Sequence, residues 1–392
     1  MRGNYKHVAL GDISIISSGG TPSRTNPRYW NGNIPWVKTA QIQNCAINEQ
    51  DVDEWITKEG LLESSAKMIP AGTILMAMYG QGKTRGQVSI LNFDATINQA
   101  CAAIELKKGV DRDYIYQFLL ASYSRIRALS NTGGQENLSA GLIKEIPLTL
   151  PPLSEQKAIA DLLSTWDEVI EKTERLIRVK EACLKGQIQR LISNRCDFWS
   201  QIKPKKIFDT ITEKSFTDEE LLSVTQDRGV IPRSMLEGRV MSPDGTTASY
   251  KLIKRGDFAV SLRSFQGGIE YSNYQGLISP AYTVLRPKME ISIDFYRLFF
   301  KSYLFIEKYL SLAVIGIRDG KQISIPDFMS IKIPVPPMQE QLEIAETLNA
   351  AQHEIDLLKQ LLKKYKLQKR GLMQKMLTGE WRVKPEMVMS YE

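Results

Sequence analysis

The stretch LPPLSEQ at residues 150–156 decides how this chain is organised, because it returns as VPPMQEQ at residues 335–341. Residues 146–193 align with residues 331–378 without a gap, and similar residues keep this register throughout. Chance does not preserve register over so long a stretch. The chain is therefore predicted to use one plan twice, with a globular unit followed by a long helix in each copy.

Each copy of this motif predicts the start of a helix. The two prolines favour extended backbone before them and cannot sit deeper inside a helix, while the glutamate after them suits a first turn. Apolar residues then recur every three or four positions, with polar interruptions at Thr173 and Lys180. Two helices of about 40 residues, each ~60 Å long, are expected to pair with each other as a coiled coil. The alternative is that each packs on its own domain.

The residues expected to build these helices and their subunit contacts are those of the two motifs and the apolar positions that follow. They are Pro151, Pro152, Glu155, Gln156, Ile159, Leu163, Ile170, Pro336, Pro337, Glu340, Gln341, Ile344, Leu348 and Ile355.

The regions before the two helices read as α+β in both halves. Short runs rich in β-branched residues predict strands, and helical patterns follow them. The predicted strands are residues 72–78, 86–91 and 101–104 in the first half and 256–261 and 281–285 in the second, with helices at 114–120 and 295–300. The order agrees between the halves while the sequences diverge, which indicates a shared scaffold with two related but different binding sites.

Composition sets broad limits on function. The length of 392 residues suggests two to three domains, and 43% hydrophobic with 24% charged residues is ordinary for a globular protein. No apolar run approaches the ~18 residues of a membrane span, and the N-terminal residues lack a signal-like apolar stretch, so a cytoplasmic location is expected. Four cysteines without a Cys-x-x-Cys pair and two histidines offer little for zinc, and neither a metal nor a cofactor is predicted.

The charge balance is compatible with a nucleic-acid partner. The net charge is +7, and neutralising phosphates requires Lys and Arg. The clearest imbalance is a run without acids that contains Lys363, Lys364, Lys366, Lys369 and Arg370. It is either a solvated helix face or a stripe that faces phosphates or a partner.

One motif imitates a nucleotide site. Residues 77–84, AMYGQGKT, satisfy a loose phosphate-loop pattern. A phosphate loop needs a helix to begin at its Gly-Lys-Thr, whereas the chain continues as RGQVSI, which is a strand pattern. A basic, glycine-rich hairpin that can approach a phosphate backbone or a groove is the better interpretation.

Catalytic signatures are missing from the sequence. Neither Pro-Pro pair has the preceding Asn or Asp and the following aromatic residue typical of amino-group methyltransferases, and no compact acidic cluster suggests a nuclease metal site. With two histidines there is also little for general-base chemistry. The chain is predicted to be a binding protein without its own active site.

The candidate contact residues are polar and basic side chains beside glycines in the divergent regions. Arg and Lys suit guanine edges and phosphates, and Gln and Asn suit adenine. The first half offers Lys38, Thr39, Gln41, Tyr79, Gln81, Lys83, Thr84, Arg85, Asn98 and Gln99, and the second half Thr225, Gln226, Arg228, Arg263, Ser264, Gln266, Arg318 and Lys321.

An ordered set of motifs resembles the specificity (S) subunit of type I restriction-modification enzymes. In the first half these motifs are LGDI (10–13), GGTPS (19–23), IPW (34–36), NQA (98–100) and IP through PPLSEQ (146–156). The second half agrees with LSVT (222–225), KRGD (254–257), SPAY (279–282), the second helix entry and LTGE (377–380). Met338 stands where leucine is more usual.

The resemblance implies two target recognition domains that each read one half of a split DNA sequence, with paired helices as a ruler between them. It implies an antiparallel coiled coil with pseudo-two-fold symmetry, and double-stranded DNA, two methyltransferase subunits and restriction subunits as partners. Adenine N6-methylation and ATP-dependent cleavage would belong to those partners. The corresponding division is 1–150 (first recognition domain), 151–196 (first spacer), 197–335 (second recognition domain), 336–380 (second spacer) and 381–392 (tail).

Two other classes remain as alternatives at this point. One is a coiled-coil scaffold that binds proteins without DNA specificity. The other is a methyltransferase fused to its own recognition domains, against which the missing catalytic motif argues.

Overall fold

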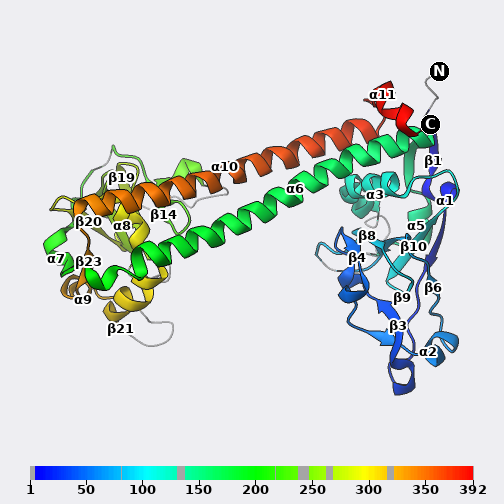
Figure 1. Ribbon diagram of the computed structural model, residues 1–392, viewed down its shortest axis with the longest axis horizontal. Helices are drawn as coiled ribbons and strands as arrows, with labels where there is room; N and C mark the ends of the chain where they lie inside the picture. The colour runs from blue at the N-terminus through cyan, green and yellow to red at the C-terminus, as the bar shows by residue number, and fades with distance from the viewer. Residues whose placement is uncertain are drawn as a thin grey trace. The chain divides into compact units, whose positions relative to one another are not determined.

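The computed structural model describes residues 5–80, 82–129, 137–216, 218–236, 247–261, 268–315 and 322–391. The chain divides into two compact units: a first unit of residues 1–174 and 360–392, and a second unit of residues 175–359. Two long helices, α6 (Leu153–Ile188) and α10 (Met338–Leu377), contribute residues to both units (Figure 1). Each begins directly after the second proline of its motif, as predicted.

The first unit is α+β. Its elements are β1 (Lys6–Ala9), α1 (Leu10–Ile13), β2 (Ser14–Ser18), β3 (Trp30–Val37), β4 (Ala46–Ile47), β5 (Trp55–Ile56), α2 (Lys58–Leu62), β6 (Met68–Ile69), β7 (Ile74–Ala77), β8 (Val88–Leu91), β9 (Ala95–Ile97), β10 (Cys101–Leu106), α3 (Arg112–Ala121), α4 (Tyr123–Leu129), α5 (Ala140–Lys144), β11 (Pro147–Leu150) and α11 (Pro385–Val388). The strands form sheets in the orders β2-β10-β7-β8-β4, β5-β3-β9-β6 and β1-β11. The pairings are antiparallel except β3 with β9 and β4 with β8.

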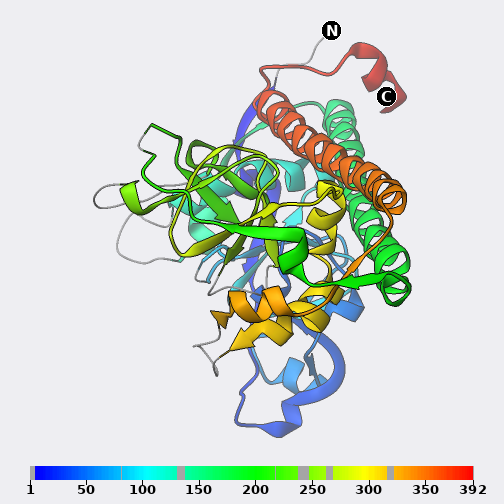
Figure 2. The same cartoon turned by 90° about the vertical axis from the view of Figure 1, so that its left-hand side faces the viewer.

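The second unit is α+β as well, and Figure 2 shows its small sheets from the side. Its elements are β12 (Ser200–Ile202), α7 (Pro204–Ile207), β13 (Phe208–Ile211), β14 (Leu222–Thr225), β15 (Gly229–Pro232), β16 (Lys251–Ile253), β17 (Phe258–Ser261), β18 (Ile269–Tyr271), β19 (Gly276–Ile278), β20 (Tyr282–Pro287), α8 (Ile293–Phe299), β21 (Val314–Ile315), β22 (Gln322–Ile323), α9 (Ile325–Ser330) and β23 (Ile333–Val335). One sheet has the order β13-β20-β17-β18, and the others are the two-stranded pairs β12-β23, β14-β15, β16-β19 and β21-β22.

The duplication predicted from the sequence is visible in the local structure. The series β1-α1-β2, β10-α3 and α5-β11-α6 of the first unit returns as β12-α7-β13, β20-α8 and α9-β23-α10. Even the helix caps agree, because Ser139 caps α5 and Ser324 caps α9 through the same side-chain oxygen. The predicted α+β duplication is thus confirmed, whereas the division into five segments stays a prediction.

The two cores bury different kinds of side chain. The first unit fills its sheet with aliphatic residues such as Ile74, Met76 and Ile104. The second is built on fully buried aromatic rings, which are Phe208, Phe258, Phe295, Tyr296, Phe299, Phe300, Phe305 and Phe328. Many of these rings meet edge to face, which aromatic quadrupoles favour. A shared plan therefore holds two differently packed cores.

The long helices pair in each unit, which excludes their packing only on separate domains. In the first unit Trp166 packs edge to face on Tyr365, and Glu174 pairs with Lys366 at 2.6 Å. In the second unit Glu181 pairs with Lys359 at 2.7 Å. The pairing is antiparallel within each unit. In the first unit Asp167 pairs with Lys369 and the later Glu174 with the earlier Lys366. In the second unit Glu181 pairs with Lys359, and Arg195, just after α6, pairs with Glu340 at the start of α10.

Candidate nucleic-acid interface

Loops of the first unit meet at one edge of its larger sheet. Ala77, the last residue of β7, lies opposite Cys101, the first residue of β10. Ala102 lies opposite Ser18, the last residue of β2. The segments that follow β2 and β7 and the segment that precedes β10 therefore leave the sheet at the same edge.

The second sheet adds another loop at this edge. Val37 and Ile97 end the parallel strands β3 and β9 side by side, and the amide of Asn98 donates to the carbonyl of Val37 at 2.9 Å. The described candidates of the first unit are thereby brought together from loops far apart in sequence. They are Lys38, Thr39, Gln41, Tyr79, Lys83, Thr84, Arg85, Asn98 and Gln99.

Lys38 and Gln41 form ion pairs and a hydrogen bond with neighbouring acidic side chains. The Lys38 ammonium lies 3.0 Å from Asp53 and 2.6 Å from Glu54, and Gln41 donates to Asp53 at 2.8 Å. The hydrogen bond that Lys38 donates to Glu54 raises the pKa of Lys38, and the one that it donates to Asp53 lowers the pKa of Asp53. Arg24 closes the cluster at 2.5 Å from Glu54 while its guanidinium stacks on Trp30. These cations are therefore already neutralised within the fold.

Asn98 and Gln99 are also used internally. The Asn98 side chain accepts from the amide of Ala100 at 3.1 Å, and Gln99 accepts from the hydroxyl of Thr21. The second unit repeats the turn, because the Ser279 hydroxyl accepts from the amide of Ala281 at 3.3 Å. This turn leads into β10 in one unit and β20 in the other, so its first role is to shape the edge.

The hairpin between β7 and β8 is the least occupied of these loops. It replaces the helix that a phosphate loop would need, which confirms the hairpin interpretation of residues 77–84. Tyr79 is 41% exposed and Lys83 is exposed. The Tyr123 hydroxyl donates to the Lys83 carbonyl at 2.6 Å, so α4 braces the loop. Arg85, in contrast, is buried.

In the second unit the corresponding edge begins where Ser261 ends β17 opposite Tyr282. A parallel bridge between Val230 and Ser272 sets the β14–β15 hairpin beside β18. Because β18 runs antiparallel to β17, the turn of this hairpin at residues 226–228 points to the same edge.

This hairpin turn is tied to the core of its unit. Thr225 accepts from the amide of Arg228 at 3.1 Å, and the Arg228 guanidinium donates to the carbonyl of Met235. Lys301 donates to the Gln226 carbonyl at 2.9 Å and pairs with Glu270, whose pKa is raised by burial although Lys301 opposes that shift. The candidates Gln81, Arg263, Ser264, Gln266, Arg318 and Lys321 lie outside the described residues.

Sequence reasoning missed what the glutamine of each motif does. Gln156 donates to the Pro151 carbonyl at 2.8 Å and accepts from the amide of Asp111, the N-cap of α3, at 2.7 Å. Gln341 donates to the Pro336 carbonyl at 2.8 Å and accepts from the amide of Ser292 at 2.8 Å. Ser292 is the N-cap of α8. Each buried glutamine therefore fastens the start of a long helix to the N-cap of another helix, α3 in the first unit and α8 in the second.

The glutamate of each motif binds a segment that follows the end of the other long helix. Glu340 accepts from Arg195 at 2.8 Å and from the Trp199 indole at 3.0 Å. Glu155 accepts from Arg382 at 3.0 Å and from the Tyr5 hydroxyl at 2.6 Å. No sequence signal indicated these partners, because they lie far away along the chain.

A polar bridge from two buried side chains to the exposed Asp167 links α3 to the helix pair in the first unit. Lys369 pairs with Asp167, which also accepts from Gln117 at 2.8 Å. Lys369 and Gln117 are both buried. One lysine of the basic run is therefore internal, whereas Lys363, Lys364 and Arg370 are exposed.

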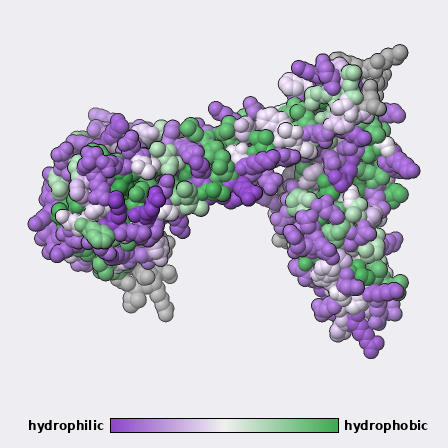
Figure 3. All heavy atoms as spheres, viewed as in Figure 1, coloured by the Kyte–Doolittle hydropathy of each residue, from purple (hydrophilic) through white to green (hydrophobic). Residues whose placement is uncertain are grey.

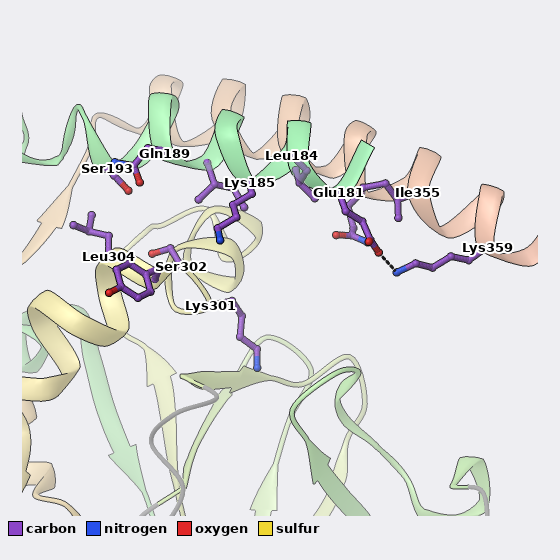
Figure 4. Close-up of a pocket in the computed structure, with 13 residues that line it drawn as sticks. Glu181, Leu184, Lys185, Gln189, Ser193, Lys301, Ser302, Leu304, Ile355 and Lys359 are labelled. Carbon is purple, nitrogen blue, oxygen red and sulfur yellow. Dashed lines mark ion pairs between the residues drawn. The ribbon is translucent and has the colours of Figure 1, made fainter. Parts of the chain in front are cut away.

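The second unit has a cavity of about 590 Å³ where the repeat would place this bridge (Figure 4). Leu184 and Gln352 line it and occupy the positions that align with Lys369 and Asp167. Ile188 and Ile355 supply further apolar wall, and Lys185 lies at the same cavity. The contact between the two long helices is therefore polar in the first unit and lined partly by apolar side chains at the equivalent place in the second.

Two kinds of structural feature are absent from the described part of the chain. No helix there is long and apolar enough to cross a membrane. No cluster of three or more His, Cys, Asp or Glu side chains within the same residues could hold a metal ion.

Fold and candidate site together define a duplicated protein whose two α+β units each gather loops at a sheet edge and contain part of the paired long helices. Residues 3–181 and 242–366 match the model of the type I restriction modification DNA specificity domain. These segments make up more than half of the chain, and the chain belongs to this family.

Relatives agree with this family. The MjaVIII specificity subunit of Methanocaldococcus jannaschii is 24% identical over 414 residues, with 97% of this chain and 94% of that protein covered. The EcoR124I/EcoR124II specificity subunit of Escherichia coli is 29% identical over 181 residues, or 45% of this chain and 44% of that one. The MjaIX specificity subunit of M. jannaschii is 30% identical over 174 residues. This last alignment spans 39% of the relative, and the EcoR124I alignment likewise spans less than half.

Solved structures agree on the fold. The S subunit of a type I restriction-modification system from M. genitalium superposes with a TM-score of 0.56 at 18% identity, covering 95% of this chain and 96% of that one. A chain from a structure of type I system assembly and conformational transition gives 0.61 at 14% identity, covering 97% and 100%. The family match also favours DNA specificity over a scaffold without it.

Proposed function

We propose that this chain is the DNA-reading subunit of a type I restriction-modification complex and that each unit reads one half of a split target. The observation that carries this is the repeated sheet edge, at which loops of divergent sequence gather on a shared scaffold. Shared scaffolds give both halves a similar approach to DNA, and different loops give them different base preferences.

Internal bonding ranks the contact residues of the first unit. The side chains of Tyr79, Lys83, Thr84 and Arg85 have no hydrogen bond or ion pair to any described residue, and we assign direct contact to their loop. Lys38, Gln41 and Asn98 are bonded within the fold, so we assign them mainly to shaping the edge. In the second unit we assign contact to the hairpin turn at Thr225–Arg228 and to the candidates outside the described residues.

The assignment is tested by mapping N6-methyladenine in genomic DNA of the host with and without this chain. We expect a split, asymmetric motif that disappears when the chain is deleted and returns when it is restored. A methylome that does not change on deletion would refute DNA specificity.

We further propose that α6 and α10 fix the gap between the two half-sites. Support comes from the membership of both helices in both units. Seven residues added to each helix at paired positions preserve the heptad register and lengthen the pair by about 10 Å. We expect the gap in the methylated motif to grow by about three base pairs, at ~3.4 Å each. Four residues added to both helices break the register and serve as the control, and an unchanged gap after the heptad insertion would refute the ruler.

We propose methyltransferase and restriction subunits as the protein partners. DNA methylation and cleavage are assigned to these partners. The complex is proposed to act in the cytoplasm. Apolar side chains reach the surface along the long helices (Figure 3), among them Val179 at 58% exposure and Leu367 at 69%. We assign these exposed apolar side chains to contacts with the protein partners. Co-purification with the methyltransferase subunit tests this, with Val179→Asp and Leu367→Asp expected to weaken capture.

A further inference from the structure

Arg85 is a buried cation that has no hydrogen-bond or ion-pair partner among the described residues. It is 7% exposed, and its Nε is fully enclosed without a hydrogen bond. No carboxylate among the described residues pairs with its guanidinium, whereas many other cations of the first unit have ion pairs. The two Nη atoms are not among the enclosed atoms, so the tip of the side chain reaches solvent.

Burial of an unpaired charge costs free energy because the protein interior solvates an ion poorly. Proteins usually reduce this cost by pairing the buried cation with a carboxylate. Arg382 is an example, because it donates to the Glu155 carboxylate, which also accepts from the Tyr5 hydroxyl. Within the described ranges of the chain, no carboxylate lies against Arg85 in this way. The position therefore suits an anion that arrives from outside.

The loop around Arg85 is shaped for a close approach. Gly80, Gly82 and Gly86 adopt positive φ angles of 137°, 68° and 82°, a region that favours glycine. A Cβ on Gly80 would lie 2.9 Å from the Cβ of Thr84, and one on Gly86 would lie 3.3 Å from the Arg127 side chain. The loop is thus tightly folded against itself and α4, which holds the neighbouring Arg85 in place.

We infer that Arg85 binds a backbone phosphate of the half-site that the first unit reads, and so positions DNA at the sheet edge. This rests on the proposed function. A fixed guanidinium can donate two parallel hydrogen bonds to a phosphate, and the exposed Lys83 in the same loop adds positive charge beside it. A phosphate contact sets register without reading a base.

The test measures DNA affinity and stability on the same variants, in the full chain assembled with its methyltransferase subunit. Arg85→Met keeps the length and apolar bulk of the side chain and removes its charge, whereas Arg85→Lys keeps the charge. Lys108→Ala is the matched control, because Lys108 is an exposed cation beyond the opposite end of β10. Binding is measured to target and non-target duplexes across a series of NaCl concentrations.

We expect Arg85→Met to weaken binding to both duplexes about tenfold and to lower the slope of log affinity against log salt by about 0.9. Its Tm should equal or exceed that of the wild type, because an unpaired buried charge is gone. Arg85→Lys should keep the slope, and Lys108→Ala should change neither quantity. The methylated motif should stay the same in all three variants.

Three results would overturn the inference. An unchanged salt slope in Arg85→Met would exclude the phosphate contact, a motif relaxed at one base would make Arg85 a base reader, and a Tm lowered by more than about 4 °C would make it a structural residue. Failure of the wild-type complex to prefer its target duplex would instead refute the proposed function itself.

Discussion

The two junctions between long helix and α+β domain use the same Glu-Gln pair with different partners. The glutamines make equivalent bonds, to Asp111 in the first unit and Ser292 in the second. The glutamates differ, because Glu340 is held by a segment in the middle of the chain and Glu155 by its two ends, Tyr5 and Arg382. The duplication therefore preserved the geometry of the junction while different segments came to complete it.

Removal of residues 380–392 should have the largest effect of the changes considered. This truncation removes Arg382, the ion-pair partner of the buried Glu155, and Tyr391, which donates to Asp161. Loss of one partner of a buried ion pair costs about 3–5 kcal/mol, so thermal unfolding should move to clearly lower temperature. Removal of residues 384–392 alone keeps Arg382 and is the control. Equal Tm values for the two truncations would contradict the role of Glu155.

Alanine in place of either motif glutamine should destabilise its unit by a similar amount. Each change leaves a buried amide and a buried carbonyl without a partner, at about 1–3 kcal/mol for each group. Chemical denaturation of Gln156→Ala and Gln341→Ala measures this, and Gln339→Ala, which lies on the exposed side of the same turn, should cost little. A large difference between the two variants would show that the junctions are not equivalent.

The contrast between the polar bridge of the first unit and the cavity of the second can be tested by transplantation. Leu184→Lys should destabilise the second unit, because the new ammonium lies at a position only 9% exposed. Gln352→Asp should recover part of this loss, with a coupling of roughly 1 kcal/mol in a double-mutant cycle. The matching cycle of Asp167→Asn and Lys369→Met measures the native bridge. A coupling energy of zero between Leu184→Lys and Gln352→Asp would mean that the helix contacts of the two units differ in backbone geometry as well as in sequence.

The smallest expected effect is on the pH dependence of stability, through the ion pair between Arg286 and Glu213. A hydrogen bond from Arg286 lowers the pKa of Glu213. A carboxyl whose pKa is lowered in the folded state contributes stability above its unfolded pKa of about 4.3 and loses it as the pH falls through the lower folded value. Glu213→Gln should therefore flatten the fall in stability below pH ~4.5 by less than 1 kcal/mol, because the pair is partly exposed. An equally steep acid transition in this variant would exclude Glu213 as a source.

Much of the fold was predictable from local sequence. Two prolines before an acidic turn start a helix wherever they occur, so α6 and α10 began where the motif placed them. Short runs rich in β-branched and apolar residues likewise located β7, β8, β10, β17 and β20. The hairpin at residues 77–84 was distinguished from a phosphate loop because a strand pattern followed it. Each of these depends on neighbours in sequence.

The candidate site was less predictable. Lys38, Gln41 and Asn98 look like free polar side chains in the sequence, yet acids and amides from other segments occupy them. Arg85 looked no different from Lys83, although one is buried and the other exposed. Burial and pairing depend on segments distant along the chain, and no local pattern carries that information.

The sequence by itself determined the duplication, the α+β character of both halves and the starting points of the two long helices. These features follow from backbone preferences and hydrophobic periodicity, which are local. Only the tertiary structure decided which cations are neutralised, what the Glu-Gln pair binds and why one seam has an ion bridge and the other a cavity. Such properties arise where distant segments exclude water together, and desolvation then selects which charges need a partner.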